Sequence, residues 1–582
     1  MNQLQHAVTW GIGSNLMSVI SDCPQRDERK GWMGDSGLSL RPFHYNYHLG
    51  AFYTFWLLNM RDNQVYQGDS HPAGTVSDTV PHTFGSYPGD PSWMTAYPGG
   101  VYELWRTYGD VRILQQHYTN LKTYISFFQD QVSKSGISDI YQYYGDWCPP
   151  PPAPMPVKGY TSAISVLVDI QRMIEIATAL GQSADAAAYQ TYRNTLVQQF
   201  NTAYLNSNSG VYGGGDGLQT ANACAYGVNA VAMANGTNAA QNIATALVND
   251  VVTAHNSHFS TGIIGMRFLH TALTQIGAGN VAVDTLLQTD YPSFGYEFTD
   301  PDEPATTLRE LLDGNSEGPG MNSRNHHMFS SVGGYLFADL GGIDQVRQFT
   351  PLYNPTDPKA VGYTHPVLFP RVTTHPNITY VQTDYASING QYGVTWINPN
   401  GTASGNNCVV QAAENTVATL SCPPGAGVFT SVVFASFGTP TGDCSSFKVS
   451  SCNALNSTTI VENACLNKTT CQINVSDQEF GDPCYDVVKS FSALLTCQNP
   501  TGITLTATVP TNAHATVRLP LNGLNPANIT IAESGTVVWN KGVYQPGVTG
   551  IYSAAVGVYD LPVGQSTIDV EVGSGTYNFI VG

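Results

Sequence analysis

The hydrophobic period of this chain changes near residue 362, and that change limits the folds open to it. Up to about Asp344, segments such as "VRILQQHYTNLKTYISFFQDQV" and "TSAISVLVDIQRMIEIATALG" place apolar residues three or four positions apart, which predicts amphipathic helices. Roughly eleven or twelve such segments fit, separated by Gly-rich or Pro-rich loops such as "YGDWCPPPPAPMPVKGY". Paired helices in that number favour a closed helical toroid over a four-helix bundle. A toroid gathers functional residues on the loops at one end.

Beyond about Gly362 the hydrophobic period is two. Short alternating segments such as "ITYVQTDYASINGQYGVTWI", "GITLTATVP" and "STIDVEV" are bounded by Asn, Gly and Pro, as in an antiparallel sandwich. A cysteine-rich stretch interrupts this series, and strands of the same character follow it. The sequence therefore predicts a multidomain α+β chain with a helical domain over 1–345, a β-domain over 362–406 and 499–582, and a module inserted at 407–498.

Cysteines indicate the compartment. Eight of the eleven lie in the inserted stretch, at Cys408, Cys422, Cys444, Cys452, Cys465, Cys471, Cys484 and Cys497. Such density in a small module is typical of a disulfide framework made in an oxidising compartment, although spacing alone leaves the pairing open. Of the others, Cys224 fits a helical core, whereas Cys23 and Cys148 are either free buried thiols or a disulfide pair.

Glycosylation sequons point the same way, toward a secreted or lysosomal glycoprotein. They lie at Asn235, Asn377, Asn400, Asn456, Asn467, Asn474 and Asn528. The first twenty residues, "MNQLQHAVTWGIGSNLMSVI", have neither a basic region nor a continuous apolar run, so they are no clear signal peptide. We expect either another export signal or an N-terminal part that this chain lacks.

Charge and motif content exclude several classes of function. The formal net charge is −19, whereas a protein that binds nucleic acid needs a basic face. No apolar run approaches the roughly eighteen residues of a membrane helix. No His, Asp or Cys set has metal-ligand spacing, and no Gly-rich phosphate loop follows a strand. We therefore expect no nucleic acid, no membrane, no metal and no cofactor.

Charge is concentrated in "SDCPQRDERKGWMGDSG", although only 11% of the chain is Asp, Glu, Lys or Arg. A site that binds hydroxyls and protonates a leaving oxygen needs ionised carboxylates, one neutral carboxyl and an aromatic plate for a sugar. Asp22 and Asp35 fit the first role, Glu28 the second and Trp32 the third. Arg26 would relieve the repulsion between the acids. The alternative is a capped helix start with surface ion pairs.

This motif resembles the hallmark of glycoside hydrolase family 78, the α-L-rhamnosidases, in its run "DCPQRDERKGWMGD". The similarity continues in the family's order through "YGDWCPP", "HFSTGIIGMRFL", "YPSFGYEF", "PATTLRELLDG" and "MNSRNHHMFSSVGGYL". The resemblance implies an (α/α)6 catalytic barrel, an inverting mechanism and a β-sandwich after the barrel.

Roles follow from the resemblance residue by residue. It implies Glu28 as general acid and Glu310 as general base, roughly 6.5–9.5 Å apart as in inverting enzymes. Sugar-binding positions match Asp22, Arg26, Trp32, Asp35, Trp93, Trp147 and His326. Plainer alternatives stay open for residues of these motifs. His326 and His327 are then histidines at a helix end, Trp147 is a packing anchor, and Asp146 is the cap of a turn.

Two departures from the family pattern matter. Tryptophans usually flank the base, whereas Arg309 and Leu311 lie near Glu310 here. We expect the adjacent Arg309 to favour the ionised form of Glu310. Family enzymes also carry β-domains before the barrel, whereas this barrel begins almost at Met1.

The inserted stretch resembles the galactose/rhamnose-binding lectin domain of the sea-urchin-egg type through "ASFGTP", "CLNKTTC", "FGDPC" and its cysteine spacing. The resemblance implies the pairs Cys408–Cys444, Cys422–Cys497, Cys452–Cys484 and Cys465–Cys471. Rhamnose-binding members use a glutamate after the first cysteine, a Tyr-Gly-Arg turn and an aspartate. Here Val409 and Phe437-Gly438-Thr439 replace the first two, and Asp482 remains.

The sequence thus predicts an exo-acting, inverting α-L-rhamnosidase that acts on rhamnose-containing glycosides or polysaccharides, with a second sugar possible at the lectin module. Two alternatives stay open. A polysaccharide lyase of the toroid fold would release an unsaturated product. A non-catalytic carbohydrate-binding protein would act through the lectin module alone.

Overall fold

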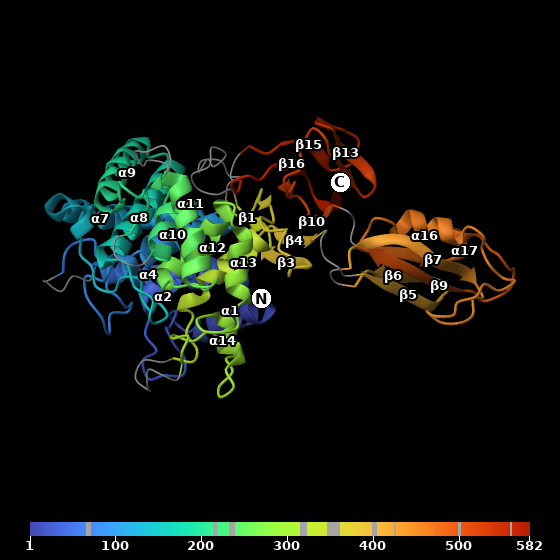
Figure 1. Cartoon of the computed structure of the whole chain (residues 1–582), viewed down its shortest axis with the longest axis horizontal. Coiled ribbons are helices and arrows are strands. Elements are labelled where there is room, and N and C mark those ends of the chain that lie inside the picture. Colours follow the sequence, from blue (N-terminus) through green and yellow to red (C-terminus); the bar gives the residue numbers. More distant parts are fainter. Residues whose placement is uncertain are drawn as a thin grey trace. The chain divides into compact units, whose positions relative to one another are not determined.

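The computed structural model describes residues 1–65, 71–213, 218–231, 239–314, 323–345, 361–398, 404–423, 426–498, 502–558 and 561–582. They form two compact units (Figure 1). Unit 1 comprises Met1–Val367, Tyr385–Gly390 and Tyr559–Gly564, and unit 2 comprises Leu368–Asp384, Gln391–Val558 and Gln565–Gly582. The sequons at Asn235 and Asn400 lie outside the described residues.

Unit 1 is helical. Its α-helices are α1 (Asn2–Asn15), α2 (Met33–Leu38), α3 (Leu40–Asn46), α4 (Gly50–Val65), α5 (Pro91–Met94), α6 (Ala96–Tyr108), α7 (Val111–Ser135), α8 (Lys158–Ala179), α9 (Ser183–Tyr204), α10 (Leu218–Gly227), α11 (Ala239–Asn249), α12 (Ile263–Gln275), α13 (Gly279–Leu287), α14 (Phe294–Thr299) and α15 (Val332–Tyr335). The short strand β1 (Ile343–Asp344) belongs to the same unit, and β2 (Val367–Leu368) has one residue in each unit.

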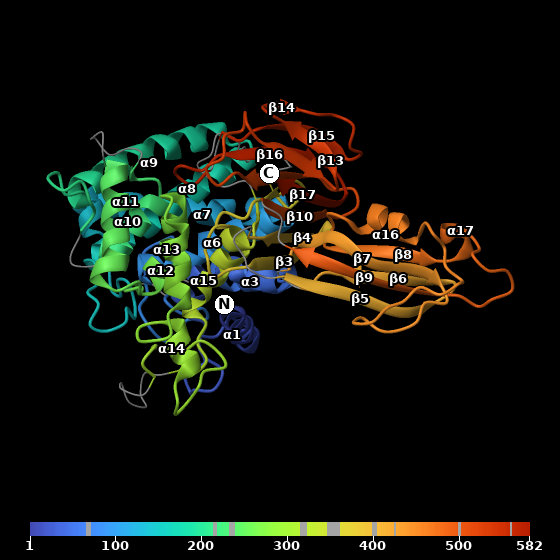
Figure 2. The ribbon, with the colours of Figure 1, turned by 45° about the vertical axis from the view of Figure 1, so that its right-hand side comes forward.

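The helices form an inner and an outer set. α6 and α8 are buried almost all round, as expected for helices enclosed by others. α7 and α9 bury one apolar stripe each and leave the opposite face in water. α8 packs against α9, and α10 packs against α12 (Figure 2). This pairing of buried with amphipathic helices is the architecture that the three-to-four spacing predicts.

Buried charges on α8 are paired within unit 1. The Arg172 guanidinium lies 2.9 Å from the Asp169 carboxylate, one helical turn earlier on the same helix. Asp169 also accepts hydrogen bonds from Thr95 and Tyr124. This network gives partners to the buried Asp169 carboxylate and Arg172 guanidinium. An unpaired buried charge would cost on the order of several kcal/mol.

Unit 2 is built from strands. They are β3 (Tyr380–Ser387), β4 (Gly390–Ile397), β5 (Ser404–Ala413), β6 (Thr416–Ser421), β7 (Val428–Gly438), β8 (Thr470–Val475), β9 (Ser490–Gln498), β10 (Ile503–Val509), β11 (Ala515–Pro520), β12 (Thr530–Glu533), β13 (Thr536–Asn540), β14 (Val543–Tyr544), β15 (Ile551–Val556), β16 (Thr567–Val572) and β17 (Gly575–Val581). One sheet has the order β14-β13-β12-β17-β10-β4-β3, and β11, β16 and β15 pair in another. β10 pairs antiparallel with β4, with Thr504 opposite Ile397.

The cysteine-rich segment has sheets of its own. β5, β9 and β7 form one sheet, β6 pairs with β8, and helices α16 (Ser457–Cys465) and α17 (Asp477–Phe480) accompany them (Figure 1). Phe437, Phe480 and Phe491 lie in its buried core. Four disulfides join Cys408 to Cys444, Cys422 to Cys497, Cys452 to Cys484 and Cys465 to Cys471, the pairs that the lectin resemblance implies.

The predicted fold class, a helical barrel followed by antiparallel β-structure with a disulfide-rich lectin-like segment, is confirmed. Cys23 and Cys224 are free and buried, so the alternative of a Cys23–Cys148 disulfide is wrong. Within the described residues, no helix combines the length and hydrophobicity that crossing a bilayer requires.

Candidate active site

The charged motif forms a closed loop that begins at Asp22 and returns to Lys30. The Asp22 N–H donates to the Lys30 carbonyl at 3.0 Å, and the Lys30 N–H donates back to Asp22 Oδ1 at 2.7 Å. Trp32 continues into an isolated β-bridge with Thr79. Arg29 adopts a positive φ of 45°, which turns the loop back on itself. The two hydrogen bonds between Asp22 and Lys30 hold the loop in one conformation and so position the side chains between them.

Arg26 lies between the two glutamates with proposed catalytic roles. Its Nη1 donates to Glu310 Oε2 at 2.9 Å, and its Nη2 forms an ion pair with Glu28 Oε2. The Nη2 atom is also 3.7 Å from Asp22 Oδ2. Burial lowers the pKa of Arg26, but the charges of Glu310 and Glu28 outweigh it, so the pKa lies above its ordinary value. One guanidinium therefore holds carboxylates from distant parts of the chain together.

Glu28 has a second partner. Its Oε1 accepts a hydrogen bond from the Trp32 indole Nε1 at 2.6 Å. About a quarter of the Glu28 side chain is exposed (24%), whereas Glu310 is almost fully buried (5%). Glu28 is thus the more accessible carboxylate of the pair.

Glu310 is held by its own backbone and by a neighbouring segment. Its N–H donates to the Ser323 carbonyl at 2.9 Å, and the Ser323 N–H donates to Glu310 Oε2 at 3.0 Å. Arg309, the neighbour of Glu310 in sequence, pairs elsewhere, with its Nη1 3.1 Å from Asp300 Oδ2. Arg26 supplies the cation at Glu310.

His326 completes the polar cluster. Its Nε2 lies 2.5 Å from Asp35 Oδ1, and its Nδ1 lies 3.7 Å from Glu310 Oε2. Burial opposes protonation, but the hydrogen bond to Asp35 and the charges of Asp35, Glu310 and Asp22 raise the pKa of His326 above its usual value. Burial raises the pKa of Asp22, and its Oδ2 has no hydrogen-bond partner among the described residues.

His327 differs from its neighbour. Its Nε2 lies 3.0 Å from the Ser21 carbonyl, and its ring packs on Phe43. Burial lowers the pKa of His327 to about 4, so the ring is neutral at physiological pH. The structure thus separates the two histidines, one in the acidic cluster and one in the packed interior.

Aromatic rings converge on Tyr144. Its ring lies 6.2 Å from Trp32, 4.3 Å from Trp93 and 5.7 Å from Trp147, centroid to centroid. Its hydroxyl donates to Asp78 Oδ2 at 2.8 Å. Trp93 is buried, and a Cβ at Gly34 would lie 2.3 Å from its indole, so α2 approaches this ring only because residue 34 is glycine.

Asp146 positions the loop that carries Trp147. Its carboxylate accepts backbone N–H groups of Gly262, Ile264 and Gly265 at the start of α12, together with the Thr220 hydroxyl. A carboxylate at a helix N-terminus satisfies donors that the helix leaves unpaired and complements its dipole. The alternative of a capping aspartate therefore describes Asp146, although it caps a helix distant in sequence.

Three side chains near the site, those of Cys23, Leu311 and Leu312, have no reactive role. Burial, followed by a hydrogen bond to Asp22, raises the pKa of Cys23 to about 12, so this thiol remains protonated. Leu311 and Leu312, which replace the family's aromatic neighbours of the base, line a small cavity of 150 Å³ with Cys148, Pro150 and Tyr291.

Among the described residues, no group of three or more His, Cys, Asp or Glu side chains is arranged to hold a metal ion.

The lectin-like segment places Asp482 in an ion-pair network. Asp482 Oδ1 lies 3.1 Å from the buried ammonium of Lys489, which also contacts Asp477 at 3.2 Å and Glu414 at 3.8 Å. Asp482 Oδ1 further accepts the Cys484 N–H at 3.0 Å. The one family residue that the sequence retains is thus already engaged within the segment.

The structure brings the predicted residues of the helical unit into two adjoining groups. One is the polar cluster of Asp22, Arg26, Glu28, Asp35, Glu310 and His326, and the other is the aromatic group of Trp32, Trp93 and Trp147. Trp32 joins them through Glu28. Sequence reasoning missed Tyr144, Asp78 and Ser323. Tyr144 lies three residues before Trp147 in a motif already recognised, whereas Asp78 and Ser323 carry no local signal.

Known proteins resemble both parts of the chain. An α-L-rhamnosidase of Streptomyces avermitilis is 28% identical over 404 residues, which cover 68% of this chain and 35% of that protein. The solved α-L-rhamnosidase of Dictyoglumus thermophilum superposes with a TM-score of 0.69 at 24% identity, over 100% of this chain and 49% of that one. The Streptomyces avermitilis enzyme complexed with L-rhamnose gives 0.67 at 22% identity, over 99% and 41%. The chain therefore spans half or less of the length of these relatives.

Family descriptions divide the chain in the same way. Residues 420–497 match the D-galactoside/L-rhamnose binding SUEL lectin domain. Residues 1–340, more than half of the chain, match the bacterial α-L-rhamnosidase six-hairpin glycosidase domain. With the helical fold and the ordered motifs, this match shows that the chain belongs to the bacterial α-L-rhamnosidase six-hairpin glycosidase family.

Proposed function

We propose that this chain is an exo-acting α-L-rhamnosidase that removes terminal α-L-rhamnosyl residues with inversion. The observation that carries the proposal is the contact of Arg26 with both Glu28 and Glu310. Two carboxyl groups on opposite sides of a pocket are the machinery of inverting glycoside hydrolysis. Relatives named α-L-rhamnosidases support the substrate class.

In the proposed reaction Glu310 is the general base. Arg26 and the Ser323 N–H both donate to its Oε2, and such contacts suit a carboxylate that takes a proton from water. The water loses a proton to Glu310 and adds to the anomeric carbon, while the glycosidic bond breaks on the opposite face and Glu28 gives its proton to the leaving oxygen. The product is β-L-rhamnose.

Glu28 is the proposed general acid, and it is the more exposed of the two. A general acid must hold a proton, whereas Arg26 and Trp32 both donate to this carboxyl group. The proposal therefore requires Arg26 to withdraw from Glu28 when the glycoside binds. Asp22 Oδ2, without a hydrogen-bond partner among the described residues, is the proposed acceptor of a sugar hydroxyl.

Four disulfides and the lectin domain fit an extracellular protein, and we propose that location. The proposed partners are rhamnose-containing glycosides or polysaccharides. Within the chain, we propose domain limits of 1–345 for the barrel, 362–406 with 499–582 for the β-domain, and 407–498 for the inserted module.

The test is proton NMR of the first sugar that the protein releases from an aryl α-L-rhamnoside, with Glu28→Gln and Glu310→Gln alongside. Glu303→Gln is the matched control, because Glu303 is about half exposed (48%) and pairs with Arg324 outside the polar cluster. We expect the β-anomer first, a rate loss of about a hundredfold or more in both site variants, and no loss in the control.

Three results would contradict the proposal. First appearance of the α-anomer would exclude inversion. Release of an unsaturated product from a uronate polymer would indicate a lyase. A folded protein that releases no sugar from any rhamnoside would leave carbohydrate binding through the lectin module as the better reading.

A further inference from the structure

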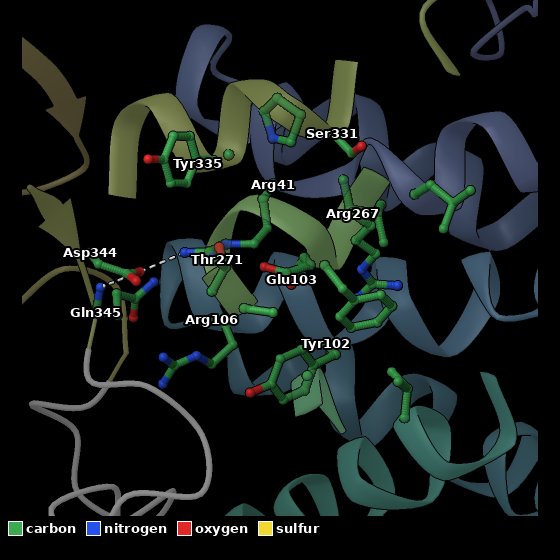
Figure 3. A pocket seen from close by; sticks show the side chains of 18 of the residues that line it. Arg41, Tyr102, Glu103, Arg106, Arg267, Thr271, Ser331, Tyr335, Asp344 and Gln345 are labelled. Carbon is green, nitrogen blue, oxygen red and sulfur yellow. Dashed lines mark hydrogen bonds and ion pairs between the residues drawn. The ribbon is translucent and has the colours of Figure 1, made fainter. Parts of the chain in front are cut away.

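A second cavity of about 560 Å³ lies inside unit 1, apart from the polar cluster (Figure 3). Its wall residues begin at Tyr102 on α6, Val168 on α8 and Arg267 on α12, whereas Trp93 precedes α6 and the Trp147 carbonyl accepts the Ile263 N–H at the start of α12. None of the residues of the polar cluster or the aromatic group is among the described residues that line it. The cavity therefore belongs to the opposite end of these helices.

The charge of the cavity wall is unlike that of the chain. The wall contains four arginines and two carboxylates, namely Arg41, Arg106, Arg172, Arg267, Glu103 and Asp344. Figure 3 shows Arg41, Glu103, Arg106 and Arg267 gathered around one space. The wall thus carries more cationic than anionic side chains, in a protein whose net charge is −19.

Two of these arginines are already neutralised. Arg41 Nη2 lies 2.6 Å from Asp344 Oδ1, and Arg172 Nη1 lies 2.9 Å from Asp169 Oδ1. Arg267 makes no ion pair or hydrogen bond with any residue that the structure describes, and its contact is with the ring of Phe268, 5.3 Å from the guanidinium carbon. The cavity thus contains a guanidinium whose charge lacks a close counter-ion within the part of the chain that the structure describes.

The surroundings of Arg267 disfavour its charge. Burial and then the positive charge of Arg172 lower the pKa of Arg267 to about 10, although Glu103 and Asp169 act in the opposite direction. A charge held in this way is unfavourable unless a partner is supplied. A guanidinium presents parallel N–H donors that match the two oxygens of a carboxylate or phosphate.

We propose that this cavity binds a small organic oxyanion, a carboxylate or phosphate compound, through Arg267. The volume is within the range of small-molecule sites, roughly 300–1,000 Å³. Ser331, whose hydroxyl has no hydrogen-bond partner among the described residues, lies on the wall for the uncharged part of the ligand, whereas the Tyr102 and Thr271 hydroxyls donate to Glu175 and Asp339. This site is independent of the proposed hydrolysis, since it shares no residue with the polar cluster.

The experiment is isothermal titration calorimetry of the full chain with sodium phosphate and with sodium citrate, at an ionic strength fixed with sodium chloride. Arg267→Met removes the charge, and Arg267→Lys keeps the charge but loses the planar fork. Arg112→Met is the matched control, because Arg112 is exposed (85%) and pairs with Asp110 on the surface. Circular dichroism and a cooperative thermal transition verify that each variant is folded.

We expect saturable binding of at least one anion to the wild type, and a loss of about tenfold or more in Arg267→Met with none in Arg112→Met. The tighter of the two probes identifies the class as phosphate or carboxylate. If Arg267→Met does not fold, Arg267→Lys must weaken the binding. Equal affinity in the wild type and a folded Arg267 variant, or no saturable heat with either anion, would overturn the proposal.

Discussion

Arg26 and Glu310 are 284 positions apart in the sequence, yet their Nη1 and Oε2 atoms lie 2.9 Å from each other. The same guanidinium contacts Glu28 on its own loop. The first loop of the barrel is thereby tied to a segment close to the end of the helical unit. One arginine side chain therefore contacts both carboxylates with proposed catalytic roles.

Replacing Arg26 with Met should lower kcat/KM for an aryl α-L-rhamnoside by about a hundredfold, because the two glutamates lose their common partner and shift. Arg29→Met is the control, since Arg29 lies on the same loop but pairs with the exposed Asp27 at 3.4 Å. Steady-state kinetics of the two variants measure the difference. Similar losses in both would mean that the loop needs its net charge and not the Arg26 contacts.

The neighbouring histidines should give opposite pH dependences of stability. His326 has a raised pKa, so its contribution is present below the unfolded pKa of about 6.5 and is lost as pH rises through the folded pKa. His327 has a pKa of about 4, so its contribution is present above about 6.5 and falls by about 3 kcal/mol as pH drops toward 4.

Thermal unfolding of the wild type, His326→Gln and His327→Gln between pH 4 and 9 tests this contrast. The difference in melting temperature between the wild type and His326→Gln should become smaller toward high pH. The difference between the wild type and His327→Gln should become smaller toward low pH. If the difference in melting temperature changes with pH in the same way for both variants, Asp35 does not hold a proton on His326.

Asp146→Asn should reduce the free energy of unfolding by about 2 kcal/mol, because three backbone N–H groups of α12 lose a charged acceptor. Asp110→Asn serves for comparison. Asp110 caps α7 through the Arg112 N–H at the surface, and its loss should cost about 1 kcal/mol or less. Chemical denaturation of both variants gives the two values. A smaller effect at Asp146 than at Asp110 would contradict the capping role.

Tyr144→Ala should raise KM for the rhamnoside about tenfold with a smaller change in kcat, since the ring contacts all three tryptophans of the proposed sugar wall. Tyr143→Ala removes the adjacent tyrosine, which is exposed (43%), and should leave KM within about twofold. Equal effects at the two positions would argue against an aromatic wall at Tyr144.

Sequence reasoning succeeded where a strong period governed the chain. The long helices α4, α7, α8, α9 and α11 and the strands β3, β4, β10, β16 and β17 follow from apolar spacing. β15 gave no such signal, because most of its side chains are at least partly exposed and do not alternate. Periodicity reports burial on one face, and a strand with little buried surface leaves no trace in it.

The site shows the same limit. Ordered motifs identified Glu28, Glu310 and His326 as neighbours, although nothing local relates them. Arg309 is adjacent to Glu310 in the sequence, yet its guanidinium pairs with Asp300, which adjacency alone does not indicate. Asp78 accepts from Ser86, Asp90 and Tyr144, and no spacing in the sequence announces that convergence.

β4 and β10 pair directly although the whole cysteine-rich segment separates them along the chain. The chain consequently leaves this sheet and returns to it about 4.8 Å away, one strand spacing. The pairing of β4 with β10 depends little on the length of the inserted segment. A longer insertion changes only the entropy of closing the connection, and that entropy changes slowly with length. A different domain whose two ends lie close together can therefore replace the lectin between β4 and β10. The register of the strands in this sheet would stay the same.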